Sequence, residues 1–134
     1  MPVVVCDSEG PEMAYILVVD GDAVTRAVVR ALLEDAGHEV AEATEGWAGL
    51  AIMGRRVPDL VITELYMDGM EGIEFLRRVR ETWPSEPVLV MSTRDHPGAA
   101  SILGIAKLLG ATGLLEKPIV ASQLVETVGS ILVA

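Results

Sequence analysis

The sequence predicts an α/β fold in which an open parallel sheet carries helices on both faces. Three observations lead to this prediction. Short apolar runs alternate with helical stripes along most of the chain, the connections between them are short, and 134 residues suit one domain with a sizeable core. Successive parallel strands need right-handed helical crossovers, which cover the sheet. We therefore expect a three-layer sandwich of five strands and five helices.

The first strand and helix have the clearest pattern. Residues 15–19 form a continuous apolar run, which is typical of a strand buried on both faces. The run ends at Asp20-Gly21-Asp22, and apolar residues then recur at three- and four-residue spacing as far as Gly37. This spacing predicts an amphipathic helix, and Asp22 is well suited to cap its N-terminus.

The next two pairs of strand and helix follow the same alternation. Residues 38–43 include charged side chains, which suit a strand at the edge of a sheet. A weaker helical stripe covers residues 47–54, and residues 60–63 form a third strand that ends at Glu64. A helical stripe over residues 73–83 completes this part of the chain.

The remaining elements are two strands and two helices. In chain order they are an apolar strand over residues 88–91, a helix over 99–109, a short strand at 114–115 and a helix over 124–131. Residues 1–13 show no period and contain turn-forming residues. We treat them as an N-terminal extension and residues 14–134 as the domain.

Charge and composition exclude several functions. A formal net charge of −10 argues against binding to a nucleic-acid backbone, which depends on Lys and Arg. No run approaches the roughly 20 apolar residues of a membrane-spanning helix, and the N-terminus has no basic leader. We therefore expect a cytoplasmic protein without a membrane partner. Cys6 is the single cysteine, which excludes an internal disulfide.

Polar side chains stand where the predicted strands end. Asp20 follows the first strand, Glu64 the third, Ser92 the fourth and Lys117 the fifth. In an open parallel sheet, functional groups collect at the carboxyl ends of the strands, where the strand order reverses. We therefore expect these four unlike residues to converge on one site.

Several motifs occur at these strand ends in a characteristic order. They are the acidic turn after the first strand, Leu60-Val61-Ile62-Thr63-Glu64, Met67-Asp68-Gly69-Met70-Glu71-Gly72, Ser92-Thr93 and Lys117-Pro118. With these motifs, the chain from Ile16 onward resembles the receiver domain of bacterial two-component response regulators. The resemblance implies a doubly wound, flavodoxin-like sheet with strand order 2-1-3-4-5 and a cis bond before Pro118.

The resemblance also implies a role in signalling. We expect a stand-alone receiver that is not an enzyme, requires no cofactor, and acts through contacts with a histidine kinase or an output protein. In that family, an aspartate at the end of the third strand takes a phosphoryl group from histidine, assisted by Mg²⁺ on neighbouring carboxylates. Ser92 retains the hydroxyl that the family uses to sense phosphate, whereas Leu114 stands where an aromatic ring is usual.

Two positions depart from the family pattern. Glu64 replaces the acceptor aspartate, and its carboxylate lies one bond farther out. A misplacement of about 1 Å can slow a transfer on the order of 100-fold, so efficient phosphorylation is not expected. Gly21 stands where a second adjacent acid is usual, so we expect weak Mg²⁺ binding in a pocket of Asp20, Asp22 and Tyr66.

Lys117 can compensate for the missing metal. At about 4 Å and an effective dielectric constant near 20, one ion pair is worth roughly 4 kcal/mol before desolvation is subtracted. We predict a permanent salt bridge between Glu64 and Lys117 that partly imitates the charge of a phosphorylated aspartate.

A contact face is predicted on the last two helices. The helix over residues 99–109 is apolar on more than one side, and the final helix is also poor in charge. We expect these helices and the strand between them to bind a partner or a second copy of the chain. The residues assigned to this face are Ile102, Ile105, Leu108, Leu109 and Val125.

Two other functions stay open at this point. One is a conventional receiver that is phosphorylated slowly on Glu64 or another acid. The other is a small phosphatase, because Val18-Val19-Asp20-Gly21-Asp22 also resembles the nucleophile motif of the haloacid dehalogenase family. Asp20 would then be the nucleophile and Asp22 the general acid, with Ser92 and Lys117 in supporting roles. No further acidic pair follows Lys117 to hold Mg²⁺, which argues against the phosphatase.

Overall fold

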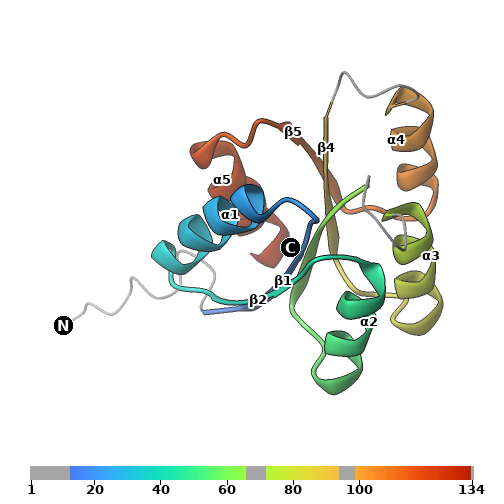
Figure 1. The fold of residues 1–134 in the computed structure, drawn as a ribbon, viewed down its shortest axis with the longest axis horizontal. Coiled ribbons are helices and arrows are strands. Elements are labelled where there is room, and N and C mark those ends of the chain that lie inside the picture. The colour runs from blue at the N-terminus through green and yellow to red at the C-terminus, as the bar shows by residue number, and fades with distance from the viewer. Residues whose placement is uncertain (1–12, 66–71, 94–98, 134) are drawn as a thin grey trace.

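Five strands and five helices alternate in the computed structural model, which describes residues 13–65, 72–93 and 99–133 (Figure 1). The elements are β1 (Tyr15–Val19), α1 (Ala23–Asp35), β2 (Glu39–Ala43), α2 (Gly46–Arg55), β3 (Leu60–Glu64), α3 (Gly72–Thr82), β4 (Val88–Thr93), α4 (Ala99–Leu108), β5 (Gly113–Lys117) and α5 (Ala121–Val133). The predicted alternation is confirmed. No helix in these ranges is long and apolar enough to cross a membrane.

The strands form one parallel sheet in the order β2-β1-β3-β4-β5. This order confirms the doubly wound topology that the resemblance implied, and it places the charged strand β2 at an edge. Two strands are longer than predicted. Ser92 and Thr93 belong to β4, and β5 runs from Gly113 to Lys117, because the parallel ladder pairs Leu89 to Thr93 with these residues. The backbone pairing continues through polar residues, so the apolar runs in the sequence do not mark the ends of these two strands.

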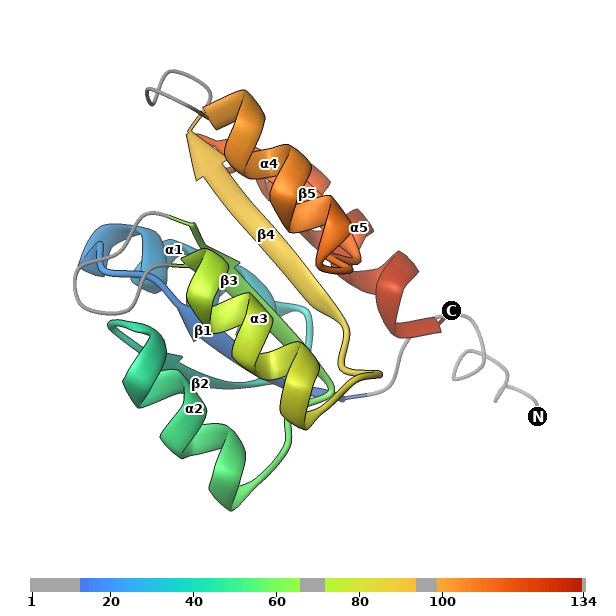
Figure 2. The ribbon, with the colours of Figure 1, turned by 90° about the vertical axis from the view of Figure 1, so that its right-hand side faces the viewer.

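The helices cover both faces of the sheet. Figures 1 and 2 show α1 and α5 on one face and α2, α3 and α4 on the other. Alternate residues of β1 point to opposite faces. Leu17 and Val19 join the buried cluster on the side of α2 to α4, whereas Ile16 and Val18 join the cluster on the side of α1 and α5. The result is the predicted three-layer sandwich with two cores.

Two local features lie at the carboxyl ends of the strands. The side chain of Asp22 accepts a hydrogen bond from the backbone N–H of Val24, so the predicted N-cap of α1 is confirmed. The peptide bond between Lys117 and Pro118 is cis, as the resemblance implied. Both features lie beside the predicted site.

Candidate functional site

Lys117, the last residue of β5, lies between two buried carboxylates. Its Nζ atom is 2.5 Å from Oε2 of Glu64 and 2.9 Å from Oδ2 of Asp20. The side chains of Asp20 and Glu64 are 2% and 5% exposed, compared with 18% for Lys117. The predicted ion pair between Glu64 and Lys117 is therefore present, and Asp20 joins it. We call these three residues the Lys117 cluster.

The charge of Lys117 depends on two opposing effects. Burial alone would lower the pKa of its ammonium group, because a buried charge loses hydration. Its close contacts with Glu64 and Asp20 outweigh burial and raise the pKa above the ordinary lysine value. Lys117 is therefore a fixed cation at neutral pH and a counter-charge for both carboxylates.

Glu64 ends β3 with both of its carboxylate oxygens engaged. Oε1 accepts a hydrogen bond of 2.7 Å from the backbone N–H of Leu65, and Oε2 contacts Lys117. The start of α3 holds this corner, since the N–H of Gly72 donates to the carbonyl of Leu65 at 2.8 Å. A Cβ atom on Gly72 would lie 2.4 Å from the carbonyl oxygen of Glu64, so a glycine is required there.

Asp20 is held by the turn that follows β1. Its backbone N–H donates to the carbonyl of Ala43 in β2, and its Oδ1 accepts a 2.8 Å hydrogen bond from the N–H of Asp22. Oδ2 faces Lys117 at ion-pair distance but without hydrogen-bond alignment, so this contact is mainly electrostatic. The carboxylate is thus fixed on one oxygen by the backbone and on the other by charge.

Asp22 points toward α1. Its Oδ1 accepts from the N–H of Val24 at 3.1 Å, and its Oδ2 accepts from the hydroxyl of Thr25 at 2.8 Å. These hydrogen bonds, with that of Thr25 the strongest, lower the pKa of Asp22. Both oxygens of Asp22 therefore serve the helix cap.

The two predicted switch residues lie near the same edge. Ser92 is 3% exposed, and its hydroxyl has no hydrogen-bond partner among the described residues. Leu114, one strand away in β5, is partly buried and packs against the core on the side of α2 to α4. The sensing role assigned to Ser92 and Leu114 remains a prediction.

The described residues do not fit a strong magnesium site. Mg²⁺ needs near-octahedral oxygen ligands. The Lys117 ammonium lies between Asp20 and Glu64, and Asp22 caps a helix. Residues 13–65, 72–93 and 99–133 contain no group of three His, Cys, Asp or Glu placed to hold a metal. Tyr66, predicted for this pocket, lies outside the described residues.

The predicted contact face is exposed in part. Ile105, Leu108 and Val125 are 44%, 88% and 40% exposed. Leu109 follows α4 and is partly buried against the core, so it contributes less surface than its neighbours. The side chain of Ile102 lies outside the described residues.

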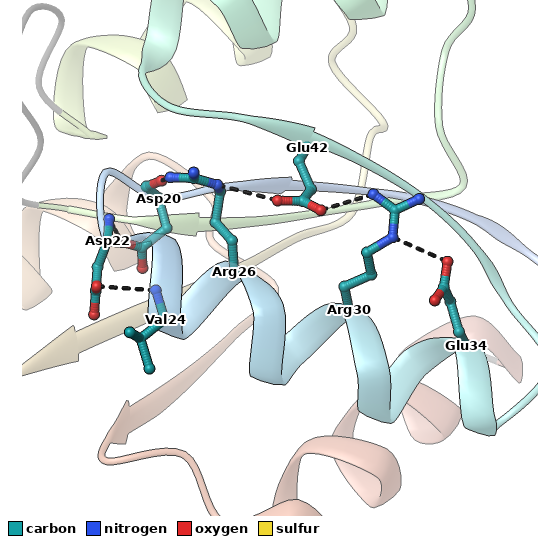
Figure 3. A network of polar contacts seen from close by, with 7 residues as sticks. All are labelled: Asp20, Asp22, Val24, Arg26, Arg30, Glu34 and Glu42. Carbon is teal, nitrogen blue, oxygen red and sulfur yellow. Dashed lines mark hydrogen bonds and ion pairs between the residues drawn. The ribbon is translucent and has the colours of Figure 1, made fainter.

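Sequence reasoning missed two features of this edge. Arg26 of α1 donates to the backbone carbonyl of Asp20 at 2.7 Å and pairs with Glu42 of β2 (Figure 3). A groove of about 450 Å³ also opens beside Lys117, and it is lined by Val24, Thr25, Val28, Thr93, Lys117, Pro118 and Ile119. The spacing of four residues from the cap Asp22 places Arg26 early in α1 but does not indicate that its side chain reaches the Asp20 carbonyl. The groove gave no sequence signal either, because its walls come from distant segments.

Relatives of the chain differ widely in length. PilH of Pseudomonas aeruginosa is 30% identical over 122 residues, which cover 90% of this chain and 98% of PilH. The sensory/regulatory protein RpfC of Xanthomonas campestris pv. campestris is 33% identical over 123 residues, 89% of this chain but only 16% of RpfC. The chain thus corresponds to nearly all of one relative and to a small part of another.

A solved structure and a family profile agree with these relatives. The chemotaxis response regulator CheY4 of Vibrio cholerae superposes with a TM-score of 0.81 at 34% identity, covering 90% of this chain and 99% of CheY4. The profile of the response regulator receiver domain matches residues 16–129. The chain therefore belongs to the response regulator receiver domain family of two-component signalling.

Proposed function

We propose that this chain is an atypical cytoplasmic receiver that signals through protein contacts and is not efficiently phosphorylated. The main support for the proposal is that both carboxylate oxygens of Glu64 already have partners. One carboxylate oxygen accepts a backbone N–H and the other meets Lys117 at 2.5 Å. Phosphoryl transfer needs an oxygen aligned with the incoming phosphorus, and small misplacements are costly. Glu64 would have to leave both partners to react.

In this proposal the Lys117 cluster keeps the pocket in one charge state. A phosphorylated aspartate presents negative charge close to the lysine of its pocket. Glu64 presents a carboxylate to Lys117 without any modification. Partners that recognise this state would be histidine kinases or output proteins, and no catalytic turnover is required.

Mg²⁺ plays little part in this function. Gly21 supplies no carboxylate, and the positive charge of Lys117 repels a second cation between Asp20 and Glu64. Gly21 also leaves room for an acid, since a Cβ atom there would meet only the carbonyl of Thr44 at an ordinary 3.7 Å. The missing metal ligand can therefore be restored by substitution.

The phosphatase alternative has less support. Its nucleophile would be Asp20, which is 1% exposed and paired with Lys117. Its general acid would be Asp22, whose oxygens bind Val24 and Thr25 and whose pKa is lowered by those hydrogen bonds, which favours the ionised form. A general acid must carry a proton at the working pH.

Acetyl phosphate with and without Mg²⁺ tests the proposal by intact mass and peptide mapping. The wild-type chain should show no phosphoryl adduct. The double variant Gly21→Asp/Glu64→Asp should acquire one on residue 64 in the presence of Mg²⁺, because it restores both the acceptor and the second acid. The single variants Gly21→Asp and Glu64→Asp are the controls, because each restores only one of the two groups. An adduct on Glu64 of the wild type would overturn the proposal in favour of a slow conventional receiver.

A further inference from the structure

Arg26 is a second cation at the edge of the Lys117 cluster. Its Nη1 atom donates to the backbone carbonyl of Asp20 at 2.7 Å, and its Nε atom pairs with Oε1 of Glu42 at 3.1 Å (Figure 3). The side chain is 16% exposed, so most of the guanidinium is shielded from water. Arg26 therefore connects the acidic turn after β1 with the edge strand β2.

Glu42 is held in place from a second side. Arg30, one turn further along α1, donates from Nη1 to Oε2 of Glu42 at 2.7 Å and from Nε to Glu34 at 3.0 Å. The hydrogen bond from Arg30, followed by that from Arg26, lowers the pKa of Glu42 against the opposing effect of burial. Glu42 is thus a fixed carboxylate that orients Arg26, and Arg30 supports it without touching the turn.

The contact with Arg26 constrains the direction of the Asp20 side chain. The N–H of Asp20 donates to the carbonyl of Ala43, and its own carbonyl accepts from Arg26. Peptide units are planar, so anchoring the groups on both sides of a Cα atom fixes its φ and ψ and the direction of Cβ. With the backbone so anchored, Oδ1 meets the N–H of Asp22 and Oδ2 meets Lys117.

We propose that Arg26 is a positioning residue of the Lys117 cluster, which holds the Asp20 turn so that this carboxylate reaches the ammonium group. Arg26 would act through the backbone of Asp20 and not on a ligand. The inference rests on the proposed function, because it assumes that the cluster is the working state of the pocket.

The chain offers a direct spectroscopic test because it contains only two lysines, Lys107 and Lys117. Selective ¹⁵N labelling of lysine gives two ammonium signals, and an ion-paired, shielded ammonium exchanges its protons with water slowly. Lys107 is exposed on α4 and provides the fast-exchanging reference. In a second, uniformly ¹⁵N-labelled sample, the amide signal of Asp22 reports on its hydrogen bond to Asp20.

The decisive comparison is Arg26→Met with Arg30→Met. Both remove an arginine from Glu42, but only Arg26 contacts the turn. In Arg26→Met we expect faster exchange of the Lys117 ammonium and a shifted Asp22 amide, whereas Arg30→Met should keep both wild-type signals. Arg26→Lys should restore part of the Lys117 protection that Arg26→Met loses, because the new ammonium can still reach the Asp20 carbonyl. Equal spectra for the Met variants would overturn the inference.

The outcomes also separate this inference from the proposed function. If the Lys117 ammonium of the wild type exchanges as fast as Lys107, the cluster itself is not the working state and the proposed function fails. If the wild type is protected and Arg26→Met is equally protected, only the role of Arg26 fails. Should Arg26→Met not fold, Arg26→Lys decides. Apart from the signal of the introduced lysine, a Lys117 exchange rate and an Asp22 amide shift identical to the wild type would count against a bridge that needs the two-sided guanidinium.

Discussion

Lys117 faces two carboxylates with a single positive charge. Asp20 and Glu64 are both almost fully buried, so each depends on the ammonium for compensation. Moving charges out of water costs several kcal/mol per ion, and a buried ion pair offsets this only when its geometry is good. The cluster is therefore more important for the shape and charge of the pocket than for the free energy of folding.

Removing the lysine should nevertheless be costly. Lys117→Met leaves two buried carboxylates facing each other, and breaking a buried pair typically costs about 3–5 kcal/mol. Urea unfolding at neutral pH measures the loss. Lys107→Met is the matched control, because Lys107 is exposed and its loss should change stability by no more than about 0.5 kcal/mol. Similar losses for the two variants would show that the cluster is not a buried ion-pair network.

Gly72 is a second residue with a specific requirement. A Cβ atom at this position would lie 2.4 Å from both the Glu64 carbonyl oxygen and the Leu65 Cα atom, and backbone atoms cannot move aside easily. We expect Gly72→Ala to lower the free energy of unfolding by about 1–3 kcal/mol. Gly54→Ala is the control, since its Cβ would meet nothing within 4 Å, and in a helix it should add up to about 1 kcal/mol. Thermal unfolding distinguishes these opposite signs.

At the scale of elements, the described side chains of α4 include two large apolar residues that are exposed. Ala106 is fully buried against the core, while Ile105 and Leu108 on the same helix are exposed. Val125 of α5 adds exposed apolar surface beyond β5. Such a face is expected to be covered in a complex. We propose self-association or a signalling partner there, as the sequence predicted.

Leu108→Ser tests this face. Leu108 is 88% exposed, so the substitution should alter stability by less than about 0.5 kcal/mol. If α4 and α5 form a dimer interface, light scattering of the wild type will show a mass that rises with concentration, and Leu108→Ser will suppress the rise. Val24→Ser is the control, because Val24 is 70% exposed but belongs to α1. A wild type that stays monomeric at high concentration would contradict self-association.

At the scale of the whole molecule, the opposite end of the sheet carries a buried acid. Glu86 precedes β4 and is 7% exposed, and its Oε2 atom has no hydrogen-bond partner in the described part of the chain. Burial, with a smaller contribution from Asp59, raises the pKa of Glu86 to about 7, although Arg80 opposes this. We therefore expect the free energy of unfolding to depend on pH near neutrality.

The sign follows from proton linkage. Glu86 has a pKa near 4.5 when unfolded and about 7 when folded, so the folded chain binds more protons between these values. Its contribution to stability is full below about pH 4.5 and is lost as the pH rises through 7. We expect Glu86→Gln to remove this loss and to be more stable than the wild type above pH 7 by up to about 3 kcal/mol.

Urea unfolding of wild type and variant across this pH range measures the difference. The wild-type curve has to be subtracted from the variant curve because His38 also makes stability depend on pH. Burial lowers the pKa of His38, so its contribution to stability is lost as the pH falls. Glu126→Gln, at an exposed position on α5, is the control and should follow the wild-type curve. A Glu86→Gln curve parallel to the wild type would contradict the assignment.

Local sequence patterns determined much of this molecule. Apolar runs located the strands, three- and four-residue spacing located the helices, and the charged residues of β2 identified an edge strand. Asp22 was recognised as a cap from its type and position, and its geometry agrees. Each of these features depends on residues close together in the chain, so the sequence alone could predict them. The same patterns stopped short of the polar ends of β4 and β5, where backbone pairing continues.

Tertiary structure decided the state of the site. Glu64 and Lys117 were expected to pair, but β5 is separated from β3 by β4, and only the folded sheet shows that Lys117 reaches both Glu64 and Asp20. The bond from Arg26 to the Asp20 carbonyl and the close approach of Gly72 to Glu64 were also unpredicted. The reason is physical: a long flexible side chain or a bare backbone group is directed by whichever neighbours the fold brings near, and sequence spacing does not encode that distance.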